Sequence, residues 1–194
     1  MKEYAVFVEG LDDLNLNDLA PKVERFAYQA INKTADFARA RNASDMRRLY
    51  NFPGNYLDPS QGRLVISKRA KTNNLESIIT GRARATSLAR FLVEDNGVNR
   101  RGVVIEMLKG QRTGLESAFP VRLNGGQSMG LAVRTKDGAK PAGAYKPSRL
   151  GKGVWLLYGI SVNQAFNYTR DMSRAEAELY LEAEFNRLMD MENL

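Results

Sequence analysis

The spacing of apolar residues changes along this 194-residue chain. After a weakly alternating start at Lys2–Val8, which predicts a short edge strand, the spacing is three-and-four, as in a helix, up to residue 61. It alternates in short runs over 62–160 and is helical again over 161–194. Strands grouped between helices predict an α+β fold with N-terminal helices, a central mostly antiparallel sheet and a C-terminal helix. We expect one domain, 1–194, with a helical part, a β-rich basic part and a second helical part.

The N-terminal part predicts two helices. Asn17 or Asp18 is placed to cap the first, and Pro21 falls in its first turn, where a missing N–H costs nothing. The apolar stripe continues to about Arg41. Ser44 then stands as a cap for a second, short helix.

The middle part predicts a β-hairpin followed by more strands. Residues 63–70 and 75–83 form two extended runs, and Lys71–Asn74 between them suit a turn. Met129–Thr135 alternates as if one sheet face were buried and the other solvated. The stretch 136–153 is rich in Gly, Pro and Lys and predicts a loop. The further strands are expected at 103–108, 118–123, 129–135 and 154–158, with Gly125–Gly126 closing a hairpin and Gly159 a turn.

Two capping boxes precede the C-terminal helices, Ser161 with Gln164 and Ser173 with Glu176. The last helix is expected over 174–191. Its predicted buried face consists of Ala177, Leu181, Phe185 and Leu188.

The last helix also carries more apolar residues than one buried face requires. Leu179, Tyr180, Met189 and Met191 lie outside the predicted stripe. This surplus predicts a subunit interface, with Tyr180, Met189 and Met191 as the candidate residues, although a deeply packed helix would have the same pattern.

The composition disfavours an enzyme. The chain has neither Cys nor His, so it lacks thiol nucleophiles, imidazole bases and the ligands that zinc prefers. The acidic pairs Asp12–Asp13 and Glu94–Asp95 stand in polar segments typical of solvated loops. We therefore expect no catalytic residue, no cofactor and no metal. No apolar run approaches the roughly 20 residues of a membrane span, so no membrane partner is expected.

Positive charge is concentrated in the middle of the chain. The formal net charge is +7, but residues 63–152 hold 18 basic and 6 acidic side chains. Such a segment attracts polyanions or an acidic protein surface, or it simply solvates exposed strands. The candidate contacts to DNA or to a partner are Arg82, Arg84, Arg90, Arg100 and Arg101.

Aromatic residues are not interleaved with these arginines, so a sequence-specific nucleic-acid module is disfavoured. Trp155 and Tyr158 stand in an apolar run. Core packing is the favoured interpretation for both, and an interface hot spot is the alternative.

Three segments carry a resemblance to a known family: residues 81–91 (GRARATSLARF), 118–123 (AFPVRL) and 154–166 (VWLLYGISVNQAF). With the first helix they resemble the phage tail-completion proteins of the prophage minor tail protein Z family. The first eighteen residues and those beyond Tyr168 match less distinctly. None of the matching segments is a catalytic signature.

The resemblance implies a structural virion protein that completes the tail and forms part of the head–tail (neck) junction. It implies assembly in the host cytoplasm and a place at the head-proximal end of the tail. The expected partners are other copies in a ring of about six or twelve, tail terminator, tail tube or head-connector proteins, and phage DNA in the lumen. The alternative is a non-specific nucleic-acid-binding protein that uses the basic middle segment.

Overall fold

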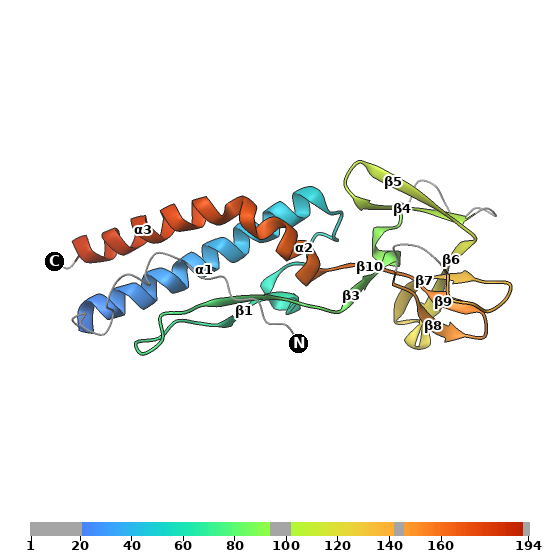
Figure 1. Cartoon of the computed structure of the whole chain (residues 1–194), viewed down its shortest axis with the longest axis horizontal. Coiled ribbons are helices and arrows are strands. Elements are labelled where there is room, and N and C mark those ends of the chain that lie inside the picture. Colours follow the sequence, from blue (N-terminus) through green and yellow to red (C-terminus); the bar gives the residue numbers. More distant parts are fainter. Residues whose placement is uncertain (1–20, 94–101, 142–145, 192–194) are drawn as a thin grey trace. The chain divides into compact units, whose positions relative to one another are not determined.

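The computed structural model describes residues 21–93, 102–141 and 146–191, and it confirms a mixed α+β fold (Figure 1). Every strand pairing in this part of the chain is antiparallel. The helices are α1 (Pro21–Leu49), α2 (Val162–Thr169) and α3 (Arg174–Asp190). The strands are β1 (Leu64–Lys68), β2 (Ile78–Gly81), β3 (Ala85–Ser87), β4 (Gly102–Leu108), β5 (Gln111–Glu116), β6 (Ala118–Leu123), β7 (Ser128–Arg134), β8 (Ser148–Gly151), β9 (Val154–Leu156) and β10 (Tyr158–Ser161).

The residues group into two compact units. Unit 1 comprises 1–45, 57–82 and 166–194, and unit 2 comprises 46–56 and 83–165. The expectation of a single domain therefore stays a prediction. The expected edge strand Lys2–Val8, the expected caps Asn17 and Asp18 and the acidic pairs Asp12–Asp13 and Glu94–Asp95 lie outside the described residues.

In unit 1, α1 and α3 pack as antiparallel neighbours (Figure 1). Phe26 and Ala30 of α1 form a buried cluster with Leu188 of α3. Further along the pair, the rings of Phe37 and Tyr180 stack with their centroids 4.4 Å apart. Leu181, Phe185 and Met189 pack against the buried cluster. The predicted stripe of α3 is thus confirmed at Leu188, which is buried, while its other members are partly exposed.

An ion triad joins the same two helices. The carboxylate of Glu184 on α3 lies 2.7 Å from Lys33 Nζ of α1 and accepts hydrogen bonds from Arg187 at 2.7 and 2.8 Å. Glu184 is itself buried, with 8% of its surface exposed. The hydrogen bonds from Arg187 and Lys33 lower the pKa of Glu184 to about 2.

Polar side chains attach the β1–β2 hairpin to α1. The Asn32 amide donates to the carbonyl of Ala70 and its oxygen accepts from the Ala70 N–H, both at 2.9 Å. The same oxygen accepts from Ser77 Oγ at 2.8 Å. Arg39 donates to the carbonyls of Leu57 and Leu64. The hairpin and its turn at Lys71–Asn74 are as the sequence predicts.

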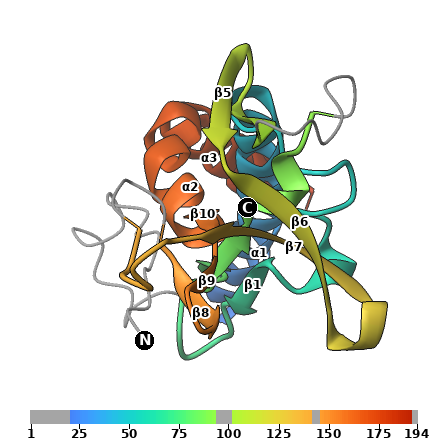
Figure 2. The same cartoon turned by 90° about the vertical axis from the view of Figure 1, so that its right-hand side faces the viewer.

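Unit 2 contains a four-stranded sheet of order β6-β7-β9-β8 and two strand pairs, β4–β5 and β3–β10. Figure 2 shows the β6–β7 hairpin as a long ribbon, closed by a turn at residues 124–127. The turn at Gly125–Gly126 is therefore confirmed. In the same unit, stacked and tilted rings of Tyr50, Phe52, Tyr56 and Phe91 form a buried aromatic cluster.

The expected break of the first helix at Ser44 is wrong. α1 runs unbroken through Ser44, which is exposed. The buried positions continue past it at helical spacing, through Ala38, Asn42 and Met46. This continuing stripe outweighs the weak preference of one serine for a cap.

Only the first of the two capping boxes forms. The Gln164 N–H donates to Ser161 Oγ and the Ser161 N–H to Gln164 Oε1, both at 3.1 Å. Ser173 makes no such cap. Its hydroxyl is buried and accepts from Asn42 Nδ2 at 3.1 Å instead, and Glu176 binds Arg41.

The predicted strand 154–158 divides at Leu157. The Leu157 N–H donates to Leu131 of β7 at 2.8 Å, while its carbonyl accepts from Leu88 at 3.1 Å. The chain thereby leaves the four-stranded sheet and pairs next with β3. Gly159 lies in β10, so the expected turn there is wrong. A Cβ at this position would lie 2.8 Å from Met107 Sδ, so the strand has little room for a side chain here.

Three further expectations for unit 2 are wrong. β7 does not alternate, because Gly130, Leu131 and Ala132 are all buried whereas Met129 is 54% exposed. Trp155 is only partly buried, at the centre of a cross-strand row between Val133 and Arg149. The stretch 136–153 contains strand β8 as well as loop.

The ion triad predicts a pH-dependent stability. The folded pKa of Glu184 is lowered, so its contribution is fully present above the unfolded pKa of about 4.5 and is lost as pH falls towards about 2. We expect Glu184→Gln to lower the free energy of unfolding near pH 7, and the difference from wild type to shrink between pH 4.5 and 2. Urea denaturation across pH measures it.

The control for this prediction is Glu178→Gln, which removes an exposed ion pair with Arg174 on the same helix. Such a pair contributes only about 0.3 to 0.5 kcal/mol. Equal effects of the two variants at every pH would contradict a stabilising role for the triad.

Gly102 predicts a second stability effect. Its φ is +129°, and a Cβ there would lie 2.2 Å from the carbonyl oxygen of Leu115. Gly102→Ala is expected to lower the free energy of unfolding by at least about 2 kcal/mol, from strain and overpacking. Gly114→Ala in the paired strand is the matched control, because nothing lies within 4 Å of its Cβ. Thermal melts that do not separate the two variants would contradict this account.

Candidate functional site

The net charge of the chain divides between the two units. By sequence, unit 2 contains 15 basic and 5 acidic residues, a net +10, whereas unit 1 contains 14 basic and 17 acidic residues, a net −3. The basic middle segment predicted from the sequence therefore corresponds mainly to one folding unit.

The arginines singled out from the sequence do not form one cluster on unit 2. Arg82 belongs to unit 1, where its backbone N–H donates to the Arg63 carbonyl at 2.7 Å beside the β1–β2 ladder. Arg84 is exposed just before β3. Arg90 is exposed and its guanidinium lies over the Tyr56 ring, 5.0 Å from the centroid. Arg100 and Arg101 lie outside the described residues.

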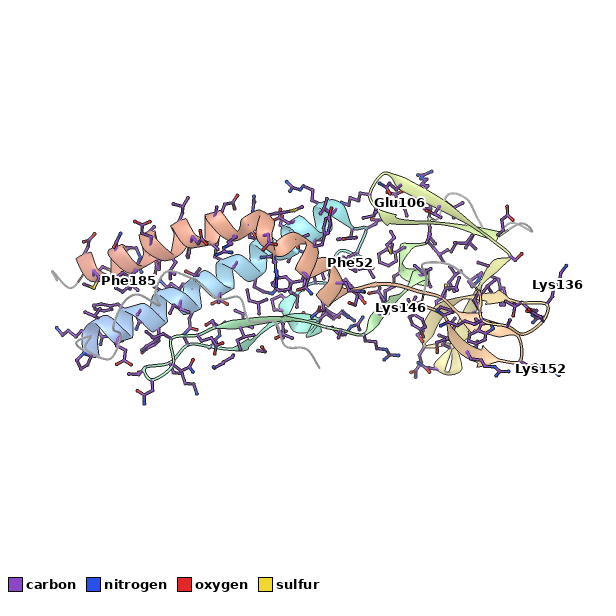
Figure 3. All side chains as sticks on the ribbon, in the orientation of Figure 1. Phe52, Glu106, Lys136, Lys146, Lys152 and Phe185 are labelled. Carbon is purple, nitrogen blue, oxygen red and sulfur yellow. The ribbon has the colours of Figure 1, made fainter. Side chains whose placement is uncertain are left out.

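One end of the four-stranded sheet gathers three other cations, Arg134, Lys136 and Lys152, which we call the sheet-end cluster. Arg134 ends β7 and pairs with Val154 of β9. The Thr135 N–H donates to the Gly153 carbonyl at 2.9 Å. This bond brings Arg134 and Lys136, the neighbours of Thr135, close to Lys152, the neighbour of Gly153. Figure 3 shows the side chains of Lys136 and Lys152 at this end of the sheet.

The sheet-end cluster is exposed and carries little compensating charge. All three side chains are exposed, and none has an ion-pair partner within residues 21–93, 102–141 and 146–191. Asp137 is the nearest acid in sequence, and its carboxylate accepts the Ala139 N–H at 3.0 Å. Unpaired cations on a fixed backbone attract phosphate or carboxylate groups of a partner.

The neighbouring edge strand extends this positive surface. All four residues of β8 are exposed, and β8 is the last strand of its sheet. Leu150, which is 44% exposed, lies in sequence between Arg149 and Lys152. We call Arg149, Leu150 and Lys152 the β8 edge. It combines one exposed apolar side chain with two cations that are close to it in sequence.

Sequence reasoning missed these residues because it assigned 136–153 to a loop. The run Arg149-Leu150-Gly151-Lys152-Gly153-Val154 could have indicated a hairpin, since Gly at 151 and 153 suits a tight turn. The charge count of the middle segment did include Arg134, Lys136, Arg149 and Lys152.

The candidate interface residues of α3 differ in their surroundings. Tyr180 stacks on Phe37 and Met189 packs against the buried cluster, so both have neighbours inside unit 1. Met191 is 69% exposed, and Leu179, which the sequence also placed off the buried face, is 66% exposed. The apolar surplus of α3 is therefore smaller than expected, and it is centred on Leu179.

The described part of the chain shows no group of three acidic side chains that could hold a metal ion. In the same part, no helix is long and apolar enough to cross a membrane. Comparisons with protein-family models, with curated proteins and with solved structures give no match. The resemblance to tail-completion proteins consequently stays an expectation.

The sheet-end cluster predicts salt-sensitive polyanion binding. Arg134→Glu with Lys136→Glu is expected to weaken binding to random-sequence duplex DNA and to flatten its dependence on salt, since each lost phosphate contact lowers the slope by about 0.9. Folding should be retained, because surface changes usually stay within about 0.5 kcal/mol. Fluorescence anisotropy across a salt series measures the binding.

The matched control is Lys109→Glu with Arg122→Glu. Both residues are exposed in unit 2, Lys109 at the β4–β5 turn and Arg122 on the opposite edge strand of the sheet. The control makes the same change in net charge. Equal losses in the two variants would mean that overall charge, rather than the sheet-end cluster, governs binding.

Proposed function

We propose that this chain is a structural virion protein that completes a phage tail at the head–tail junction, where copies form a ring around the DNA passage. The observation that carries the proposal is the division of charge and exposed apolar surface between the two units. Unit 2 presents unpaired cations, while α3 of unit 1 presents Leu179 beside exposed acids. Surfaces of this kind suit protein–protein contacts with polar rims.

The residues that the chain offers support assembly rather than catalysis. Without Cys or His, a nucleophile or proton relay would depend on hydroxyls, carboxylates, lysines or tyrosines. The pKa of the Glu184 carboxylate is lowered, and its hydrogen bonds engage it between two helices. We assign it a stabilising role within unit 1. The resemblance of residues 81–91, 118–123 and 154–166 to tail-completion proteins points to the same class.

A second function is favoured by the sheet-end cluster. A non-specific nucleic-acid-binding protein would use Arg134, Lys136 and Lys152 to neutralise phosphates directly. The two functions differ in strength of binding. Cations that line a DNA passage need only weak contacts, whereas a nucleic-acid-binding protein would bind duplex DNA tightly at physiological salt.

Electron cryo-microscopy of intact phage particles tests the proposal. We expect density for this chain as a closed ring of about six or twelve copies at the head-proximal end of the tail. The basic surface of unit 2 should face DNA or an acidic neighbouring ring. A single copy, copies scattered along the tail, or absence from the particle would reject it.

A further inference from the structure

The exposed apolar side chains of the two units have borders of opposite charge. On α3, Ala175, Leu179 and Ala183 follow one another at four-residue spacing and are all exposed, so they form one ridge. Glu178, Glu182 and Asp190 lie on the adjacent ridge and are exposed as well. We call these six residues the α3 face.

Most of the negative charge of the α3 face is uncompensated. Glu178 pairs with Arg174 at 2.9 Å. Glu182 and Asp190 have no ion-pair partner in the part of the chain that the structure describes. Arg187, the other cation of α3, is engaged by Glu184. The apolar ridge is therefore bordered by net negative charge.

The β8 edge has the opposite border. Leu150 is its exposed apolar residue, and Arg149 and Lys152 supply positive charge on either side of it in sequence. Arg149 makes one weak contact, from Nε to the Gly151 carbonyl at 3.4 Å, and Lys152 has no ion-pair partner among the described residues. An apolar residue among acidic residues complements, in polarity and charge, an apolar residue among basic ones.

We infer that the α3 face of one copy binds the β8 edge of a second copy of this chain. The contact is heterologous, since it joins two different surfaces, so each bound copy still offers one free surface of each kind. Repetition of such a contact gives a ring when the rotation closes. The inference rests on the proposed function and adds to it the surfaces through which copies would meet.

Charge-exchange variants of the full chain test the inference. Glu182→Lys with Asp190→Lys makes the α3 face positive, and Arg149→Glu with Lys152→Glu makes the β8 edge negative. Each variant alone then juxtaposes like charges and should self-associate at least about tenfold more weakly than wild type. A mixture of the two variants restores opposite charges at both contacts, and so does one chain with all four changes. Both should associate as wild type does.

Sedimentation velocity over a concentration series provides the readout, and circular dichroism checks that each variant is folded. Wild-type association should weaken as salt rises from about 0.1 to about 1 M, where the Debye length falls from about 10 to about 3 Å. Lys109→Glu with Arg122→Glu is the control for equal net charge away from the β8 edge, and it should associate like wild type.

Three outcomes would overturn the inference. Either double variant on its own could associate as strongly as wild type, the mixture of the two could fail to regain wild-type association, or the wild-type chain could stay monomeric at every concentration. The proposed function is judged separately. A ring in the particle together with unaffected charge-exchange variants would keep the function and reject these surfaces. A wild-type chain that associates through these two surfaces but is absent from the particle would keep the surfaces and reject the function.

Discussion

Unit 1 depends on one helix that meets two different kinds of neighbour. Towards α3, α1 offers apolar side chains, an aromatic ring and Lys33. Towards the β1–β2 hairpin it offers Asn32 and Arg39, whose side chains satisfy backbone groups at Ala70, Leu57 and Leu64. A partly buried amide that meets both a donor and an acceptor fixes register, because a shift would leave those groups unpaired.

The fold class and most elements could be predicted from the sequence because they follow from periodicity and turn chemistry. The hairpin at Lys71–Asn74 and the Ser161–Gln164 capping box depend on neighbouring residues only, and both formed. The failures depend on partners distant in sequence. Ser173 has the capping pattern, but Asn42, 131 residues away, engages its hydroxyl.

The candidate site was predicted less well than the fold. Arginines that are close in sequence were the candidate contacts, but they do not share one site: Arg82 belongs to unit 1 and Arg90 lies over an aromatic ring. The sheet-end cluster joins residues 134, 136 and 152, which the pairing of β7 with β9 brings together. Neither Arg134 nor Lys152 is exceptional in its local sequence. Their common location follows from strand register, which short-range patterns do not specify.

An exposed edge strand offers unpaired backbone groups to any other strand, and for soluble proteins that is a route to aggregation. Arg149 and Lys152, the cations that would contact an acidic helix, also oppose such strand pairing, because they repel the same cations on a second β8 edge. Two copies brought together β8 to β8 would place like charges opposite one another. The charges of the edge thus disfavour a symmetric β8–β8 contact, which would stop assembly at a dimer. They still allow a different surface of another copy to bind.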